Sequence, residues 1–319
     1  MNKVLESTKF VVENTEHIKI DKDKIKDFCK SLDYESIKNW LEESPFEIQS
    51  LSDKEKLHFL LVFNAISFSY WGEPKWSVEY KGKTYDRGSW SLVVAIGRAF
   101  DEKIPVLDPK YLSKITGSEL KNVLRGNVVI PLFEERLKIL NEIGKVLVKK
   151  FEGDFSNLVN LAKGDAIKLL DLIVSNFPSF NDVSTYKGKE IFFYKRAQAL
   201  VEGIYSLFDG KSFGNLKNIS NLTACADYKI PQILERMGIF IYDDKLSKKI
   251  NDKIEIPKNI EMEVEIRANT IWTVEHIKEE LKKLGKNVDS IHINDYLWLN
   301  AGSTSPKEKP YHLTRTTAY

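Results

Sequence analysis

The stretch EIRANTIWTVEHIKEELKKLG, residues 265–285, decides the fold class of this protein. Its apolar residues recur every three or four positions, as they do on one face of an α-helix. Gly285 stands at the end, where a glycine commonly terminates a helix. We therefore predict one long helix here, and the same kind of pattern recurs in both directions along the chain.

Helical periodicity dominates outward from this segment. We expect helices within residues 22–43 (two short ones), 53–70, 90–101, 109–125, 131–150, 154–176, 190–209 and 231–238. Ser52 and Glu55 have the spacing of a capping box, and Pro131, Gly153 and Pro178 interrupt the pattern. One β-hairpin is expected within residues 75–88, where Lys81-Gly82-Lys83 turns the chain. The prediction is a mainly α protein with a small β-hairpin, forming a single domain over residues 1–319 or two closely packed helical lobes around a central pocket.

The composition indicates a globular protein with a small ligand. The 319 residues are 42% hydrophobic and 29% charged, which is typical of a globular chain. The formal net charge is only +2, whereas proteins that bind duplex nucleic acid usually carry a strong basic excess. A small anionic ligand therefore fits this chain better than a nucleic acid polymer.

Cysteine content and targeting signals indicate the compartment. Cys29 and Cys225 are the two cysteines, too few for a disulfide framework or for a zinc site made of four cysteines. The N-terminal MNKVLESTKF lacks the basic and apolar regions of a signal peptide, and no apolar run reaches 18 residues. We expect a cytoplasmic protein with reduced thiols and no membrane span.

Several familiar catalytic signatures are missing from the sequence. It contains no GxGxxG after a strand, no P-loop, no HExxH and no GxSxG, and its five histidines are scattered. These observations argue against phosphate-loop hydrolases, dinucleotide oxidoreductases and metalloproteases. We expect neither a metal nor an organic cofactor.

Four clusters of residues stand out instead. They are Thr223-Ala224-Cys225-Ala226-Asp227-Tyr228, Phe193-Tyr194-Lys195-Arg196-Ala197-Gln198, Asp295-Tyr296-Leu297-Trp298-Leu299-Asn300 and Tyr311-His312-Leu313-Thr314-Arg315-Thr316. An acid among small and aromatic residues can lie in a partly dry pocket, where its charge acts strongly. The residues alone leave plainer alternatives open: Asp227 could cap a helix, Asp295 could cap a helix or lie in a turn, and Lys195 and Arg196 could form surface ion pairs.

In this order and near these spacings, the four clusters resemble the queuosine salvage protein family, the queuosine 5′-phosphate N-glycosylases. Further matching stretches are Lys75-Trp76-Ser77-Val78, Trp90-Ser91-Leu92, Ile130-Pro131-Leu132, Phe177-Pro178-Ser179 and Glu265-Ile266-Arg267, so the resemblance extends from Ser7 to Tyr319. It implies a fold like that of the helical DNA glycosylases. It also implies hydrolysis of the N-glycosidic bond of queuosine 5′-phosphate, which releases queuine and ribose 5-phosphate.

The resemblance also implies roles for individual residues. Asp227 falls on the family's catalytic acid, and the positions that bind queuine fall on Cys225, Ala226, Asp295, Tyr296 and Asn300. Many members have an aromatic residue at the position of Cys225, an acid at that of Asn300 and a histidine at that of Ser44, before Pro45. Ser44 is therefore an expected substrate contact whose chemistry differs from that of the family.

The substrate's phosphate needs cationic donors. The cluster available in the sequence is Lys195, Arg196, His312 and Arg315, of which we favour Lys195. Two alternative functions stay open at this point: a DNA-repair glycosylase, and a protein that binds queuine or its nucleotide without cutting it. The expected partner is the small-molecule substrate, without stable nucleic acid or membrane binding, and the sequence leaves the oligomeric state undetermined.

Overall fold

A computed structural model describes residues 2–34, 37–301 and 309–319. Its helices are α1 (Lys3–Glu13), α2 (Lys22–Ser31), α3 (Asp53–Ala65), α4 (Gly88–Asp101), α5 (Pro109–Leu112), α6 (Gly117–Val123), α7 (Phe133–Lys150), α8 (Phe155–Leu161), α9 (Ala166–Asn176), α10 (Lys195–Leu207), α11 (Lys229–Arg236), α12 (Asp244–Asn251), α13 (Glu261–Lys283) and α14 (Ser290–Asn300). The prediction of a mainly α fold is confirmed.

The strands of the described residues form three small antiparallel pairs, whereas the sequence predicts one hairpin. β2 (Val78–Tyr80) pairs with β3 (Lys83–Tyr85), which is the expected hairpin. β4 (Val183–Tyr186) pairs with β5 (Lys189–Phe192), and β1 (Ile18–Ile20) pairs with the distant β6 (Phe240–Tyr242). The predicted helix over 190–209 is therefore wrong at its start, because its first residues belong to β5 and the helix begins at Lys195.

The observed helix ends match the predicted ones where residues close together in the sequence cap the helix. The Ser52–Glu55 capping box starts α3, and Gly285 follows α13 with a φ of 78°, which favours glycine. Two predicted helices are each divided in two. The segment 109–125 splits into α5 and α6, because Thr116 and Glu119 form a second capping box, and 154–176 splits into α8 and α9, where Asp165 caps a new helix.

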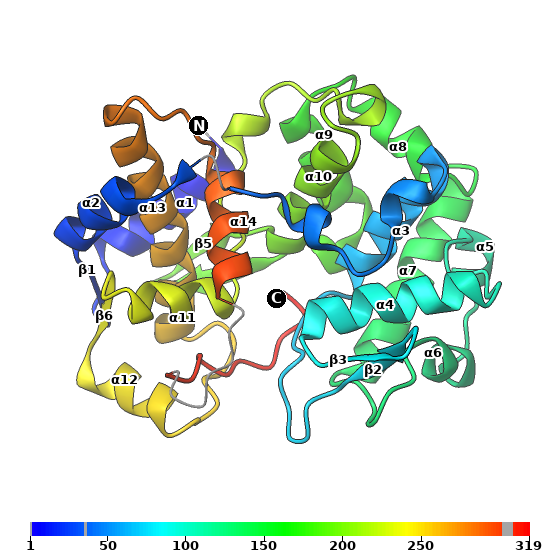
Figure 1. Cartoon of the computed structure of the whole chain (residues 1–319), viewed down its shortest axis with the longest axis horizontal. Helices are drawn as coiled ribbons and strands as arrows, with labels where there is room; N and C mark the ends of the chain where they lie inside the picture. The colour runs from blue at the N-terminus through cyan, green and yellow to red at the C-terminus, as the bar shows by residue number, and fades with distance from the viewer. Residues whose placement is uncertain (1, 35–36, 302–308) are drawn as a thin grey trace.

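The helices lie in two groups on either side of a central region (Figure 1). Helices α3 to α10 lie on one side, and α2 and α11 to α14 lie on the other, with the C-terminus between them. There are two buried hydrophobic clusters, and α13 contributes to both: Val264, Ala268 and Ile271 belong to the cluster of α3 to α10, and Ile266, Val274 and Ile277 belong to the other. Val4 and Val11 of α1 join the first cluster, and α1 packs against α13.

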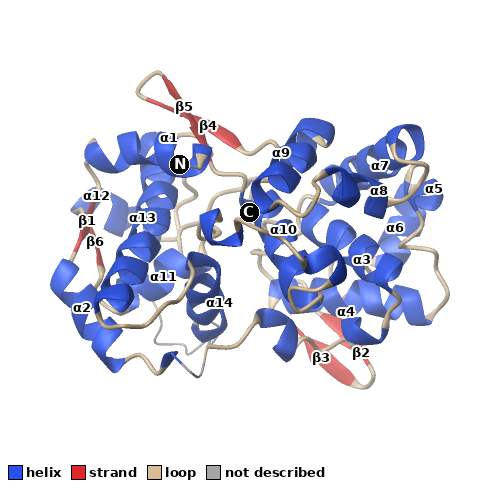
Figure 2. Ribbon diagram, turned by 90° about the horizontal axis from the view of Figure 1, so that it is seen from above, coloured by secondary structure: helices blue, strands red, loops and turns tan. Residues whose placement is uncertain are grey.

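The C-terminal segment 309–319 links the two groups of helices. Ile256 N donates to Leu313 O at 2.7 Å on one side. On the other side, Ser69 N donates to Tyr319 O at 2.8 Å, and Ser69 Oγ donates to Thr316 O at 2.6 Å. Both views place the C-terminus at the junction of the groups (Figures 1 and 2). This segment therefore helps to close the central region where the candidate site lies.

Candidate active site

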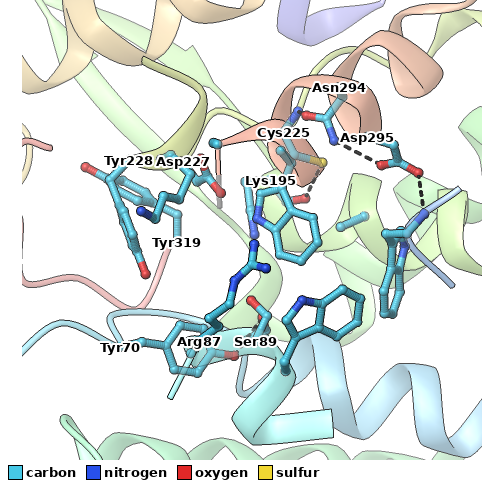
Figure 3. Close-up of a pocket in the computed structure, with 18 of the residues that line it drawn as sticks. Tyr70, Arg87, Ser89, Lys195, Cys225, Asp227, Tyr228, Asn294, Asp295 and Tyr319 are labelled. Carbon is cyan, nitrogen blue, oxygen red and sulfur yellow. Dashed lines mark hydrogen bonds between the residues drawn. The ribbon is translucent and has the colours of Figure 1, made fainter. Parts of the chain in front are cut away.

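A cavity lies between the two groups of helices. Its lining comes from α3, α4, α10 and α14, from the segment before α11 and from the C-terminal segment. In Figure 3, Asp227, Tyr228 and Tyr319 lie toward one end, Asn294 and Asp295 toward the other, and Lys195 and Cys225 between them. Four predicted site residues, Lys195, Cys225, Asp227 and Asp295, thus line one cavity although the sequence separates them by up to 100 positions.

Asp227 is held in place by the start of α11. Its Oδ1 accepts hydrogen bonds from Lys229 N at 2.8 Å and Ile230 N at 3.1 Å, so the alternative that this residue caps a helix is confirmed. The cap does not use the whole carboxylate, because Oδ2 accepts no hydrogen bond from a described residue. Asp227 is 7% exposed and lines the cavity. Capping therefore orients this carboxylate and leaves one oxygen for a ligand.

The backbone that leads to Asp227 is also fixed. Thr223 N donates to Gln198 Oε1 at 2.9 Å, and Arg267 Nε donates to Ala226 O at 3.4 Å. Ala226 is buried and contributes its carbonyl to this support. Such positioning matters because a displacement of a catalytic group by about 1 Å can cost on the order of a hundredfold in rate.

Aromatic rings surround the Asp227 end of the cavity. The rings of Tyr228 and Tyr311 lie 4.7 Å apart between centroids, and Lys229 Nζ lies 4.8 Å from the Tyr311 ring centre. Burial raises the pKa of the Tyr228 phenol well above its ordinary value. These tyrosines are therefore neutral and offer apolar faces with hydroxyl groups.

Asp295 lies in the middle of α14, so the alternative that it caps a helix or turns the chain is wrong. It is 4% exposed, and its Oδ2 accepts from Asn39 Nδ2 at 3.1 Å and from Trp40 N at 3.3 Å. Asn294 Nδ2 donates to its Oδ1 at 3.3 Å. Burial raises the pKa of Asp295 well above its ordinary value, and the charge of nearby Glu202 raises it further.

Glu202 on α10 is a cavity residue that the sequence analysis missed. It accepts hydrogen bonds from Ser206 Oγ at 2.7 Å, Asn39 Nδ2 at 2.9 Å and Trp40 Nε1 at 3.2 Å. Burial raises the pKa of its carboxyl group. The sequence did contain a signal for Glu202. Gln198 and Glu202 lie four positions apart in a largely apolar helix, so both polar side chains fall on the same helix face.

The cavity also holds unpaired cations. Arg87, next to the start of α4, and Lys195, the first residue of α10, line it and make no ion pair with any residue in the described ranges. Both point into the central part of Figure 3. Lys75 contributes a further ammonium group to the lining. Arg87 was not among the predicted residues, because nothing in its local sequence distinguishes it from a surface arginine.

Three of the four predicted phosphate donors lie elsewhere. Arg196 is 2% exposed and donates to Ala65 O and Ser179 O, so its guanidinium supports the backbone. His312 is buried against the Tyr319 ring, and burial lowers its pKa to about 3, which keeps it neutral. Arg315 stacks on the Trp71 ring, outside the set of residues that line the cavity. Of that cluster, Lys195 alone reaches the cavity.

Cys225 lines the middle of the cavity. Its backbone N donates to Asn294 Oδ1 at 2.8 Å, which ties the segment before α11 to α14. Burial raises the pKa of its thiol to about 12, so the sulfur is neutral and is no nucleophile. Its Sγ donates to Lys195 O at 3.6 Å, so this neutral side chain contacts the start of α10.

Besides the buried Ala226, three predicted contacts lie outside this cavity. Tyr296 and Asn300 line a separate recess that shares Arg87 and Trp90 with the cavity, and Asn300 Nδ2 donates to Tyr296 O at 2.8 Å. Ser44 ends the short 3-10 helix Trp40–Glu43, and its Oγ donates to Phe46 O at 2.8 Å. Their roles in binding substrate stay predictions.

The described residues hold neither a metal-binding cluster nor a membrane-spanning helix. No group of three or more His, Cys, Asp or Glu side chains among them is arranged to hold a metal ion. None of the helices in these ranges is both long enough and apolar enough to cross a membrane.

Comparison with known proteins places the chain in a family. The model of the family described as "Queuosine salvage protein" matches residues 48–319. The chain belongs to the queuosine salvage protein family. A relative from Sphaerobacter thermophilus is 38% identical over 99% of this chain and 97% of its own, and one from Bos taurus is 37% identical over 98% of each. A relative from Mus musculus is 35% identical over 98% of each chain. All three carry the name queuosine 5′-phosphate N-glycosylase/hydrolase.

Membership of the queuosine salvage family agrees with the resemblance that the sequence clusters carry. The matched region contains every residue named above as lining the cavity except those of the short 3-10 helix at Trp40–Glu43. The family match therefore covers the structure that holds the candidate site.

Proposed function

We propose that this protein hydrolyses the N-glycosidic bond of queuosine 5′-phosphate and releases queuine and ribose 5-phosphate. One observation carries the assignment of roles: Asp227 holds one carboxylate oxygen in a fixed cap and presents the other to a cavity that has further carboxyl groups at its opposite end. The names of the relatives supply the substrate.

Asp227 acts at the ribose. Breaking the glycosidic bond builds positive charge at the anomeric carbon, and a carboxylate beside that carbon stabilises the charge. The free Oδ2 can do this without loss of the cap that Oδ1 makes. Once the base has departed, the same oxygen can accept a proton from the attacking water. One carboxylate thus serves both steps in turn.

The base lies toward the Asp295 end. Queuine is a 7-deazaguanine, so it lacks the N7 atom that other purine glycosidases protonate, and its departure depends on hydrogen bonds to its remaining polar atoms. Asp295 can accept from the N–H groups of the guanine-like edge. The rings of Trp40, Trp90 and Trp298 line this part of the cavity, and aromatic faces suit a flat heterocycle.

The phosphate fits the cationic part of the lining. Arg87 and Lys195 each lie at the N-terminal end of a helix, α4 and α10, where backbone N–H groups also favour an anion. Ser89, one residue into α4, lies beside Arg87 in Figure 3. We therefore assign the 5′-phosphate to Arg87 and Lys195, in place of Arg196, His312 and Arg315.

The same proposal includes the protein's organisation and surroundings. We propose that residues 1–319 act as one domain, because the cavity needs side chains from both groups of helices. We place the protein in the cytoplasm, where free cysteines such as Cys29 and Cys225 persist in reduced form. Its partner is the small-molecule substrate, and neither nucleic acid nor a membrane has a part in the reaction.

The deciding experiment is incubation of the protein with queuosine 5′-phosphate, followed by chromatography for queuine and ribose 5-phosphate. Both products should appear with wild-type protein and not with Asp227→Asn, which keeps the acceptor for the cap. Binding of substrate without products would instead support a queuine-binding protein. Release of a damaged base from duplex DNA would support a DNA-repair glycosylase.

A further inference from the structure

Two carboxyl groups meet in the cavity, those of Glu202 on α10 and Asp295 on α14. A single nitrogen lies between them: Asn39 Nδ2 donates to Glu202 Oε1 at 2.9 Å and to Asp295 Oδ2 at 3.1 Å. The orientation of this amide is fixed, because Asn39 Oδ1 accepts from Leu41 N at 2.8 Å. Each amide hydrogen therefore serves one carboxyl group and holds the two side by side.

The donors that surround this pair are all neutral. Trp40 donates its indole N–H to Glu202 and its backbone N–H to Asp295. Ser206 and Asn294 supply a hydroxyl and an amide. Within the described ranges no lysine, arginine or histidine forms an ion pair with either carboxyl group. Two ionised carboxylates so placed repel each other strongly, since little solvent screens them.

The other titratable groups of the cavity do not change this balance. They are the cations of Lys75, Arg87, Lys195 and Lys229, the carboxyl groups of Asp86 and Asp227, the thiol of Cys225 and the phenols of Tyr70, Tyr228, Tyr311 and Tyr319, whereas α3 contributes only the neutral Phe63 and Asn64. None of these cations forms an ion pair with Glu202 or Asp295 within the described ranges. The thiol of Cys225 is neutral. Burial raises the pKa of both carboxyl groups of the pair, which accords with the geometry.

We propose that Glu202 and Asp295 share one proton and together hold the departing base. The ionised member accepts from the N–H groups of the guanine-like edge, and the protonated member donates to the neighbouring carbonyl oxygen. Which of the two carries the proton need not be fixed, because strongly interacting groups titrate as a pair. This inference rests on the proposed function, and it gives Glu202 a role in leaving-group stabilisation.

The shared proton stabilises the leaving group of this reaction. When the glycosidic bond breaks, its electron pair moves onto the base and spreads to the carbonyl oxygen, since no N7 is available for protonation. A hydrogen bond to that oxygen strengthens as the charge grows, so it stabilises the transition state more than the substrate. Water supplies the hydroxyl group to the ribose and the proton to the base nitrogen, and the pair ends the reaction with the proton it held at the start.

The kinetic test compares Glu202→Gln with Glu202→Ala in single-turnover reactions on queuosine 5′-phosphate. The wild-type rate should fall as the pH rises and the pair loses its proton. Glu202→Gln keeps an N–H donor that cannot ionise, so the alkaline fall should vanish while the rate at neutral pH stays within about tenfold. Glu202→Ala removes the donor, and the rate should fall about a hundredfold. An unchanged alkaline fall in Glu202→Gln would overturn the proposal.

A spectroscopic test examines the proton without any reaction. The infrared spectrum of wild-type protein at neutral pH, minus that of Glu202→Gln, should contain the stretching band of a protonated carboxylic acid. Subtraction removes other buried carboxyl groups such as Glu263. Asp295→Asn should give the same difference band and serves if Glu202→Gln does not fold. Absence of the band would refute the shared proton even if the protein cleaves the substrate, whereas a band without cleavage would refute the proposed function alone.

Discussion

Arg267 and Asp182 form a buried, bidentate ion pair, in which Nη1 lies 3.0 Å from Oδ1 and Nη2 lies 2.5 Å from Oδ2. The same guanidinium donates through Nε to Ala226 O, and the same carboxylate accepts from Lys195 N at 3.2 Å. One pair of side chains on different elements thus positions the residue before Asp227 and the start of α10. It connects the proposed catalytic carboxylate to the proposed phosphate site.

Breaking this pair should destabilise the protein strongly. Arg267→Met leaves the Asp182 carboxylate buried without its partner, and we expect unfolding in urea to cost about 3–5 kcal/mol less than in wild type. The exposed pair Lys248–Asp252 is the matched control, since Lys248→Ala should change stability by less than about 1 kcal/mol. Wild-type protein should unfold in a single transition if the two groups of helices act as one domain, as we propose. Two separate transitions would contradict that expectation.

The same ion pair predicts how stability depends on pH. Burial alone would raise the pKa of Asp182, but the charge and hydrogen bonds of Arg267 outweigh it and hold the pKa below its ordinary value. The resulting stabilisation is present above the pKa of the unfolded chain, about 3.9, and is lost as the pH falls through the lower folded value. Stability should therefore decline in acid, and the decline should be shallower in Asp182→Asn. Equal acid slopes for the two proteins would show that this carboxylate contributes nothing to them.

Asp227→Asn should abolish turnover and leave the affinity for queuine within about tenfold of wild type. The amide keeps an oxygen for the hydrogen bonds from Lys229 N and Ile230 N, and only the charge is lost, so kcat should suffer far more than affinity. Asp227→Ala also removes the cap and should lose about 1 kcal/mol of stability. Rate measurements and calorimetry on both variants separate the two effects. A sizeable residual kcat in Asp227→Asn would rule out this carboxylate as the essential group.

Removal of either proposed phosphate ligand should reduce the preference for the 5′-phosphate. A charge-assisted contact contributes about 1.5–3 kcal/mol, so kcat/KM for queuosine 5′-phosphate should fall roughly ten- to a hundredfold in Arg87→Ala and in Lys195→Ala. Cleavage of the bare nucleoside should change little. Arg315→Ala removes the same charge from outside the cavity and should keep the wild-type preference. If Arg315→Ala alone lost it, the phosphate would lie elsewhere.

Asp295→Ala should weaken the binding of queuine and leave the binding of ribose 5-phosphate unchanged. Without the carboxyl group, buried donors of the base lose their acceptor, at a cost of roughly 1–3 kcal/mol. Calorimetric titration with each product separately tests this expectation. Asn300→Ala, on the same helix but in the separate recess, should have a smaller effect on queuine. Unchanged affinity in Asp295→Ala would mean that this residue has only a structural role.

Much of the local structure follows from the sequence. The capping box of Ser52 and Glu55, the glycine after α13 and the β2–β3 hairpin depend on residues a few positions apart, so local chemistry is enough to predict them. The pairing of β1 with β6 was not predictable in this way, because Ile18 and Tyr242 meet only in the folded chain. The β4–β5 hairpin was also missed, but it is a local structure. Its turn, Lys187-Gly188, joins two strands that follow each other in the sequence, so local chemistry could have predicted it.

The sequence by itself determined the helical class, the candidate acid Asp227 and the family that its clusters resemble. Only the tertiary structure decided which charged residues share the cavity. Arg196 and Lys195 are neighbours in the chain, yet Arg196 supports buried carbonyl groups and Lys195 lines the cavity, because adjacent residues on a helix point in different directions. Glu202 and Asp295 lie far apart in sequence and form a pair through Asn39. The sequence gives the chemical type of each side chain, but tertiary packing determines which groups surround it. Those surrounding groups determine whether the side chain is charged.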